Sequence, residues 1–183
     1  MTSPRKRNQV RIIGGSHRRH LVHFSDHEGL RPTADSVRER LFNWLGQDLY
    51  GQRVLDLFAG SGALGFEAAS RGAASVVMVE MNRRVWQQLQ DNQHRLSLPE
   101  VQCIHQDALT HLAHSPAQFD LVFLDPPYAW QQWPQLWPLL LPKLNNGAQI
   151  YLEAGTLPEI PSSLSVTRSG RSGMSHYQLL LNE

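Results

Sequence analysis

The sequence predicts an α/β fold: a mainly parallel sheet of seven strands with an antiparallel C-terminal hairpin, preceded by a small N-terminal β-hairpin and helix. Three observations support this prediction. From position 53 onward, short apolar segments alternate with longer amphipathic segments. A glycine-rich turn follows the first apolar segment, and the chain ends with two strand-like segments joined by Gly-Arg-Ser-Gly. Repeated strand–helix units give parallel strands with helices on both faces of the sheet.

The first 50 residues predict a smaller unit that precedes the sheet. Residues 10–15, VRIIGG, have the pattern of a short strand that ends in a glycine turn, and residues 20–24, HLVHF, alternate as its hairpin partner. Pro32 prevents a helix before it, and Thr33 is a candidate N-cap for the helix that follows. The apolar face of that helix carries Val37, Leu41, Trp44 and Leu45.

The boundaries follow from these patterns. We expect a flexible basic tail over 1–9, the hairpin and helix over 10–50, and the main α/β domain over 51–183. The strands of the main domain are expected at 53–58, 75–80, 101–107, 119–125, 148–153, about 163–169 and about 175–182. Its helices are expected at 60–71, 82–96, 108–113 and 133–141.

Composition limits where the protein works. No apolar run reaches the length of a membrane-spanning helix, and the N-terminus lacks the apolar segment of a secretory signal. The single cysteine, Cys103, cannot form an internal disulfide and is expected in the core. Together these features predict a cytoplasmic protein.

Arginine is unevenly used. The chain has 17 basic residues and a net charge of only +1, yet six of the basic residues lie among the first 20 positions, without an acid. The planar guanidinium suits phosphates and stacked bases, so this end of the chain predicts a nucleic-acid surface. The arginines expected to contact RNA phosphates are Arg11, Arg18, Arg19 and Arg38.

Two other sets of residues receive a structural interpretation. Four histidines are regularly spaced but have no fixed carboxylate or cysteine companion, so no metal site is predicted. They are His17, His20, His23 and His27. Three tryptophans at helical spacing are expected to pack one helix face into the core rather than to form a stacking platform. They are Trp130, Trp133 and Trp137.

Acids and glycines gather where the predicted strands end. After the first strand, Gly60, Gly62 and Gly65 satisfy the pattern G-x-G-x-x-G, which lets a ligand approach the backbone where a helix begins. Glu80 ends the second strand, where an acid can accept hydrogen bonds from ribose hydroxyls. Asp107 ends the third, as a possible reader of an adenine edge or a simple N-cap. Ligands bind beyond the carboxyl ends of parallel strands, so these residues predict one nucleotide-like site.

The fourth strand ends in Asp125-Pro126-Pro127-Tyr128. The two prolines remove two backbone donors and fix two φ angles, so the chain forms a rigid corner. An exocyclic amine of a base becomes nucleophilic when acceptors bind its N–H groups, and the Asp125 carboxylate and Pro126 carbonyl are two such acceptors. Tyr128 could stack on the base. Together with Asp56, which precedes the glycine turn, this corner favours methyl transfer over the hydride transfer of nicotinamide or flavin enzymes.

These motifs resemble a known family. DLFAGSGALGFEAASRGA, VVMVE and FDLVFLDPPY resemble the Rossmann-like class I S-adenosylmethionine-dependent methyltransferases that act on amines. VRIIGG and GLRPTADSVRERLFNWL narrow the resemblance to the bacterial 16S rRNA guanine-N2 methyltransferases. The resemblance covers nearly the whole chain. It implies S-adenosylmethionine as cofactor, 16S rRNA of the small ribosomal subunit as partner, and the exocyclic N2 of the guanine at position 966 as target.

The resemblance also implies roles for individual residues. Those expected to bind the cofactor are Asp56, Phe58, Gly60, Gly62, Glu80, Met81, Asp107, Ala108, Arg31 and Thr33. Arg31, Pro32 and Thr33 match a family loop that closes over cofactor and target, so segment 10–50 is expected to act as a lid. The catalytic residues are expected to be Asp125, Pro126, Pro127 and Tyr128.

Two alternatives remain open from the sequence. A DNA adenine-N6 methyltransferase has the same catalytic corner, but 183 residues leave little room for the recognition insert that such enzymes usually carry. A non-catalytic RNA-binding protein could retain the fold, although the intact acid and prolines argue against it. We expect a monomer.

Overall fold

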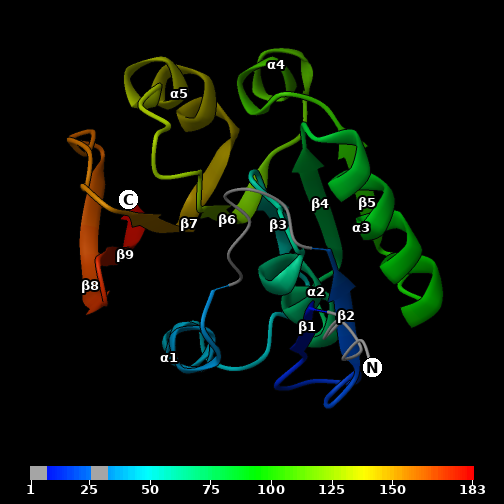
Figure 1. The fold of residues 1–183 in the computed structure, drawn as a ribbon. Helices are drawn as coiled ribbons and strands as arrows, with labels where there is room; N and C mark the ends of the chain where they lie inside the picture. The colour runs from blue at the N-terminus through cyan, green and yellow to red at the C-terminus, as the bar shows by residue number, and fades with distance from the viewer. Residues whose placement is uncertain (1–7, 26–32) are drawn as a thin grey trace.

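The computed structural model describes residues 8–25 and 33–183, and a seven-stranded sheet forms its centre (Figure 1). The strands are β3 (Arg53–Asp56), β4 (Ser75–Glu80), β5 (Val101–His105), β6 (Phe119–Leu124), β7 (Leu144–Ala154), β8 (Leu164–Ser172) and β9 (Ser175–Asn182). Their spatial order is β5-β4-β3-β6-β7-β9-β8. β3 to β7 pair in parallel, whereas β9 is antiparallel to both β7 and β8. The predicted fold class is confirmed.

Helices cover both faces of the sheet. They are α1 (Asp35–Trp44), α2 (Ala63–Ser70), α3 (Arg83–Leu96), α4 (Ala108–His114) and α5 (Trp133–Leu140), which is followed by the 3-10 turn η1 (Leu141–Lys143). Phe42, Phe66 and Leu89, from α1, α2 and α3, belong to the apolar core on one face. Leu112 and Leu136, from α4 and α5, belong to the core on the other. The central strands are therefore covered on both faces, whereas β8, at the edge of the sheet, is mostly exposed.

The aromatic and sulfur-containing side chains behave largely as the sequence predicts. Trp133 and Trp137 are buried in the core beneath α5, which confirms the packing interpretation, and Trp130 is partly buried against Phe58. Cys103 is half-buried and packs against the opposite core. Within the described residues, no helix combines the length and the apolar character that crossing a bilayer requires.

The N-terminal hairpin consists of β1 (Asn8–Arg11) and β2 (Leu21–Phe24), which pair antiparallel. The short strand predicted within 10–15 begins earlier than expected, whereas the glycine turn predicted at its end is present at Gly14 and Gly15. β1 begins at Asn8, within the expected tail, and ends at Arg11, although the Ile12 N–H still donates across the hairpin to the His20 carbonyl at 2.9 Å. The Ile13 and Gly14 N–H groups each donate to Glu67 of α2 at 2.9 Å. These two hydrogen bonds attach the hairpin to α2.

Two helices begin later than predicted. Ala34, not Thr33, occupies the N-cap position of α1, and no side chain caps this helix. α2 begins at Ala63 instead of position 60, because Gly60 and Gly62 have φ angles of 54° and 83°, in the left-handed region that a right-handed helix excludes. Both corrections concern residues at the candidate site.

Candidate active site

The glycine turn after β3 is held by two acids from neighbouring strands. The Gly65 N–H donates to Asp56 Oδ2 at 3.0 Å, and the Gly60 N–H donates to Glu80 Oε2 at 3.0 Å. The other oxygen of Glu80 accepts from the Asn82 N–H at 2.9 Å. A side chain at Gly62 would collide with Phe66, since its Cβ would lie 2.5 Å from Cε2 of that ring. The predicted spacing of glycines and acids therefore forms one shelf at the carboxyl ends of β3 and β4.

Asp56 lies beneath this shelf and is almost completely buried, with 1% of its surface exposed. Burial raises the pKa of its carboxyl group from 3.8 to about 7; the hydrogen bond from Gly65 opposes this shift, and the nearby charge of Glu80 adds to it. No ion pair compensates Asp56 among the described residues. A cationic ligand at the shelf would stabilise the ionised form.

The Asp-Pro-Pro-Tyr corner follows β6, the strand that pairs with β3 on the other side. Burial raises the pKa of Asp125 well above its ordinary value, and the charges of Glu153 and Asp56 raise it further. A hydrogen bond from Thr33 Oγ1 to Asp125 Oδ2, at 3.3 Å, opposes the shift. Since Asp56 pairs in register with Phe123, two residues before Asp125, both acids lie at the carboxyl ends of adjacent strands.

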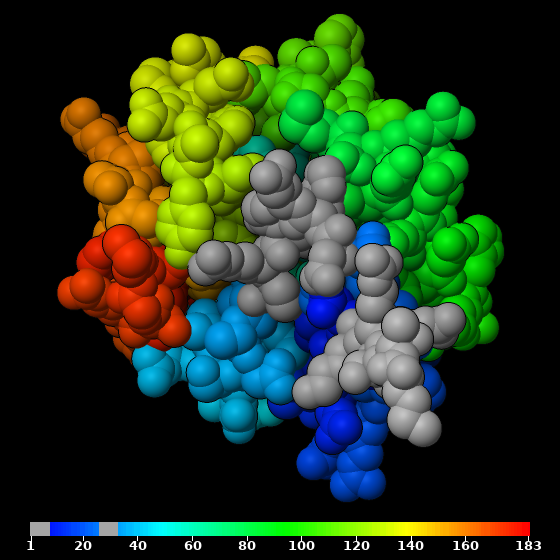
Figure 2. Space-filling model, viewed as in Figure 1, coloured from blue at the N-terminus to red at the C-terminus, as the bar shows by residue number. Residues whose placement is uncertain are grey.

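Tyr128 projects from the corner with 61% of its surface exposed. Its hydroxyl forms a 2.6 Å hydrogen bond with Ser175 Oγ of β9, and its ring lies against Gly155, where a Cβ would come within 2.8 Å of Cδ1. Beside it is a cavity of about 440 Å³ without a charged residue in its lining, bounded by Pro127, Tyr128, Trp130, Leu157 and Met174 among others. On the face in Figure 2, the segment after β6, in yellow-green, adjoins the β8–β9 turn, in orange-red. The ring is thus fixed at one edge and open on the other side.

The remaining predicted cofactor residues occupy the same edge or lie outside the described residues. Asp107 caps α4, since its Oδ2 accepts from the N–H and Oγ1 of Thr110 at 3.1 and 3.2 Å; it is exposed. Met81 is 69% exposed after β4, and Ala108 is buried. Arg31 lies outside the described residues, as do Pro32 and His27.

The predicted RNA contacts are divided by the structure. Arg11, Arg18 and Arg19 of the hairpin are exposed. The expectation that Arg38 faces RNA is wrong, because the side chain is completely buried and pairs with Glu67, at 3.3 Å, and with Asp35. A buried, paired guanidinium cannot reach a phosphate.

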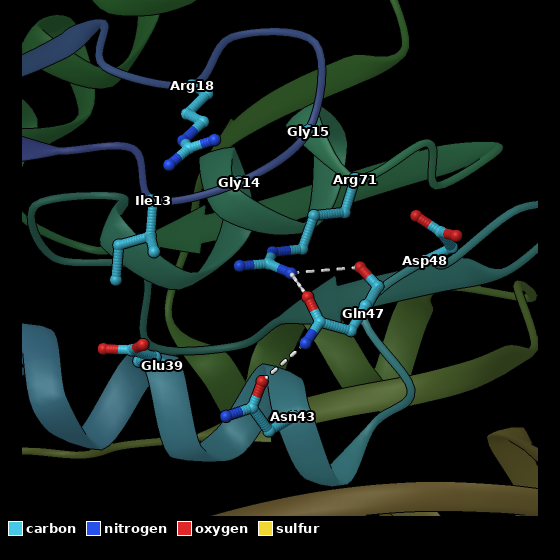
Figure 3. Close-up of a pocket in the computed structure, with 9 residues that line it drawn as sticks. All are labelled: Ile13, Gly14, Gly15, Arg18, Glu39, Asn43, Gln47, Asp48 and Arg71. Atoms are coloured by element: carbon cyan, nitrogen blue, oxygen red, sulfur yellow. Dashed lines mark hydrogen bonds between the residues drawn. The ribbon is translucent and has the colours of Figure 1, made fainter.

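Sequence reasoning missed the buried ion network around Glu67. This fully buried carboxylate accepts from the backbone of the hairpin, from Arg38 and from Arg71 Nε at 2.9 Å. Arg71 also donates to the Gln47 carbonyl at 3.1 Å and lines a second cavity of about 440 Å³, which Figure 3 shows. A signal was present: ALGFEAAS is an apolar helix with one acid, and a buried acid requires partners.

Known proteins resemble the chain over nearly its whole length. The family model described as Conserved hypothetical protein 95 matches residues 10–181. The chain belongs to this family. It is 39% identical over 180 residues to ribosomal RNA small subunit methyltransferase D of Escherichia coli K12, covering 96% of this chain and 91% of that one. The protein of the same name from Haemophilus influenzae is 37% identical over 188 residues, covering 98% and 97%. The resemblance found in the sequence is confirmed.

Solved structures agree with this assignment. The putative methyltransferase yhhF from Escherichia coli superposes with a TM-score of 0.87 at 37% identity, covering 96% of this chain and 99% of that one. A 16S rRNA N2 methyltransferase of Thermus thermophilus, in complex with AdoMet and guanosine, gives a TM-score of 0.71 at 23% identity and covers 97% and 50%. The second likeness concerns the fold alone. The fold is that of class I methyltransferases.

Proposed function

We propose that this protein is an rRNA methyltransferase that transfers a methyl group from S-adenosylmethionine to the N2 amine of the guanine at position 966 in 16S rRNA. One observation carries the chemical part of the proposal. Asp56, beneath the glycine shelf, is paired with Phe123 of the neighbouring strand, so Asp125, two residues further on its rigid corner, lies at the same edge of the sheet. The relatives named small subunit methyltransferase D support rRNA as substrate.

The shelf has the features that S-adenosylmethionine requires. Glu80 would accept hydrogen bonds from the ribose hydroxyls, and the glycine turn leaves room for the ligand at the start of α2. Asp107 and the Ala108 backbone would lie at the adenine, with Phe58 and Met81 beside it. When bound, the cofactor supplies a methyl group on a positively charged sulfur. Asp56 and Asp125 would both be favoured as anions by that charge.

The corner supplies acceptors for the amine. The Asp125 carboxylate and the Pro126 carbonyl would bind the two N–H groups of the guanine amine, so that its lone pair is directed at the methyl group. Pro127 adds rigidity and no competing donor. As the N–C bond forms, the methyl–sulfur bond breaks and the amine loses one proton, which Asp125 is placed to accept and pass to solvent. Tyr128 would stack on the base after it leaves its helix.

The N-terminal unit would supply affinity for the RNA. Arg11, Arg18 and Arg19 are exposed on the hairpin and would contact phosphates, with Arg31 and Thr33 at the boundary with the cofactor. In this proposal residues 1–9 are a basic arm, 10–50 a lid and 51–183 the catalytic domain. The protein would act as a cytoplasmic monomer on small-subunit particles.

Methyl transfer from labelled S-adenosylmethionine tests the proposal. Small-subunit particles from cells that lack the gene should accept one methyl group, recovered by mass spectrometry as N2-methylguanine at position 966. Duplex DNA should accept none; methyladenine in DNA would favour the DNA enzyme instead. Absence of cofactor binding by calorimetry would favour a non-catalytic RNA-binding protein.

A further inference from the structure

Arg38 occupies a junction between four parts of the molecule. Its Nη1 donates to Glu67 Oε2 of α2 at 3.3 Å and to the Arg11 carbonyl of β1 at 3.0 Å. Its Nη2 donates to Asp35 Oδ1 at the start of α1, and its Nε donates to the Thr33 carbonyl at 3.3 Å. A guanidinium has five N–H donors in a rigid plane, so one buried side chain can fix all four acceptors at once.

Thr33 lies between this junction and the candidate catalytic acid. Its carbonyl is held by Arg38, its side chain is 8% exposed, and its hydroxyl donates to Asp125 Oδ2. Thr33 precedes α1 and is not its cap, so the cap geometry of the helix does not explain its orientation. Its carbonyl is bound by Arg38 and its hydroxyl by Asp125, so the residue links the two side chains.

We propose that Arg38 is a positioning residue for methyl transfer, which holds the Thr33 hydroxyl on the Asp125 carboxylate and thereby orients that carboxylate toward the substrate amine. This rests on the catalytic role proposed for Asp125. Arg38 acts through Thr33, and the residue that sequence reasoning assigned to RNA would serve the reaction from inside the protein.

The charges around Asp125 make its pKa sensitive to the hydrogen bond from Thr33. Glu153 of β7 and Asp56 of β3 both face this carboxyl group and raise its pKa, and Tyr151 of β7 donates to Glu153 Oε2 at 2.7 Å. The Thr33 hydroxyl opposes them, because it donates to the ionised form. Loss of this donor should raise the pKa of Asp125 further, so that the acceptor form is reached only at higher pH.

Arg71 provides a matched control. It binds the same acid as Arg38, through Glu67 Oε1, and is also buried, with 6% of its surface exposed. Its guanidinium donates to the Gln47 carbonyl (Figure 3) and lies over the Phe42 ring, 4.7 Å from the ring centroid. Arg38→Met and Arg71→Met each deprive Glu67 of one cation. The first also releases Asp35 and the carbonyls of Thr33 and Arg11, and the second releases Gln47, so only the first disturbs Thr33.

The experiment compares the pH dependence of single-turnover methyl transfer at saturating cofactor. Thr33→Val and Arg38→Met should each move the acidic limb of the profile up by about one pH unit, which is a rate about tenfold lower below that limb. Thr33→Ser, which retains the hydroxyl donor, and Arg71→Met should keep the acidic limb near its wild-type position. In the double variant Thr33→Val/Arg38→Met, the shift should equal that of Thr33→Val alone. An unshifted Arg38→Met profile, or an equal shift in Arg71→Met, would overturn the inference.

A second measurement separates this inference from the proposed function. The carbon-13 shift of the Asp125 carboxyl, assigned with Asp125→Asn, reports its titration without RNA or cofactor. If the wild-type protein methylates no RNA, the proposed function fails, whereas a raised Asp125 titration in Thr33→Val and Arg38→Met still supports the contact. If Arg38→Met does not fold, Thr33→Val with Thr33→Ser decides: equal titration of Asp125 in both overturns the inference.

Discussion

The carboxyl edge of the sheet and the N-terminal hairpin region use charged residues in opposite ways. At the edge, the charges of Asp56 and Glu153 both act on Asp125, and none of these three acids forms an ion pair within the described residues. Beneath the hairpin, Glu67 is completely buried, whereas Asp125 and Glu153 are only partly buried, and it meets two arginines and two backbone amides. The second arrangement is satisfied by the chain itself. The acids at the sheet edge have no cationic partner among the described residues, and a cationic ligand would supply one. Repulsion between their charges lowers stability, as is common at functional sites.

The largest effect should come from Glu67→Ala, in the buried ion network beneath the hairpin. The substitution would leave two buried guanidinium groups and two amides short of a partner, so we expect a loss of about 3–5 kcal/mol in the free energy of unfolding. Urea titration measures this loss. Glu39→Ala, on the exposed face of α1, is the control and should stay within about 0.5 kcal/mol of wild type. Equal stability of the two variants would show that the network does not hold the fold.

Asp125→Ala, at the carboxyl edge of the sheet, should lower activity without lowering stability. We expect methyl transfer to fall by about 100- to 1000-fold, as for the loss of one preorganised group at a reacting centre. Cofactor affinity should be nearly unchanged, and the unfolding midpoint without ligand should not fall, because a repelled carboxylate has been removed. Rate measurements, calorimetry and thermal unfolding check the three parts, with Asp91→Ala on exposed α3 as control. Unchanged turnover would remove Asp125 from the mechanism.

Glu80→Ala should weaken cofactor binding by about 10- to 100-fold, the effect of losing hydrogen bonds to a charged acceptor. The substitution also removes the acceptor of the Gly60 N–H, which donates to Glu80 in the wild-type protein. Calorimetric titration with S-adenosylmethionine measures the affinity. A variant that binds as tightly as wild type would show that the ribose assignment is wrong.

Asp56→Asn sharpens the comparison through pH. Folding raises the pKa of Asp56 from its ordinary value of 3.8 to about 7, so between these values the folded state binds more protons than the unfolded state. Wild-type stability therefore falls as pH rises through this window, by up to about 1.4 kcal/mol per pH unit, and the Asn variant lacks this loss. Urea titrations at several pH values without ligand should show the variant gaining on wild type as pH rises. A constant difference would mean that Asp56 is ionised throughout.

The two regions also differ in how far the sequence could predict them. At the sheet edge, Gly60, Glu80 and Asp125 follow strands, and the topology of a parallel sheet places strand ends together, so their proximity followed from order along the chain. The burial of Arg38 could not be predicted from the sequence, because it depends on Glu67, 29 positions later. Helical periodicity cannot distinguish a solvated arginine from a buried one with a partner. Thr33 was misassigned for the same reason: its sequence is that of a cap, and its partner lies 92 positions away.

Substitution of the exposed arginines should have the smallest effect. The change in RNA affinity separates arginines that contact RNA from those that belong to the buried ion network. Arg18→Ala and Arg19→Ala each remove one cation from the hairpin, so we expect RNA affinity to weaken by a few-fold. The salt dependence of binding should become shallower by about one unit of slope for each phosphate that the protein no longer neutralises. The single-turnover rate at saturating RNA should not change, since neither side chain touches the candidate catalytic corner. Filter binding over a range of salt concentrations measures the slope. A variant with the wild-type slope would place that arginine off the RNA, as burial already places Arg38.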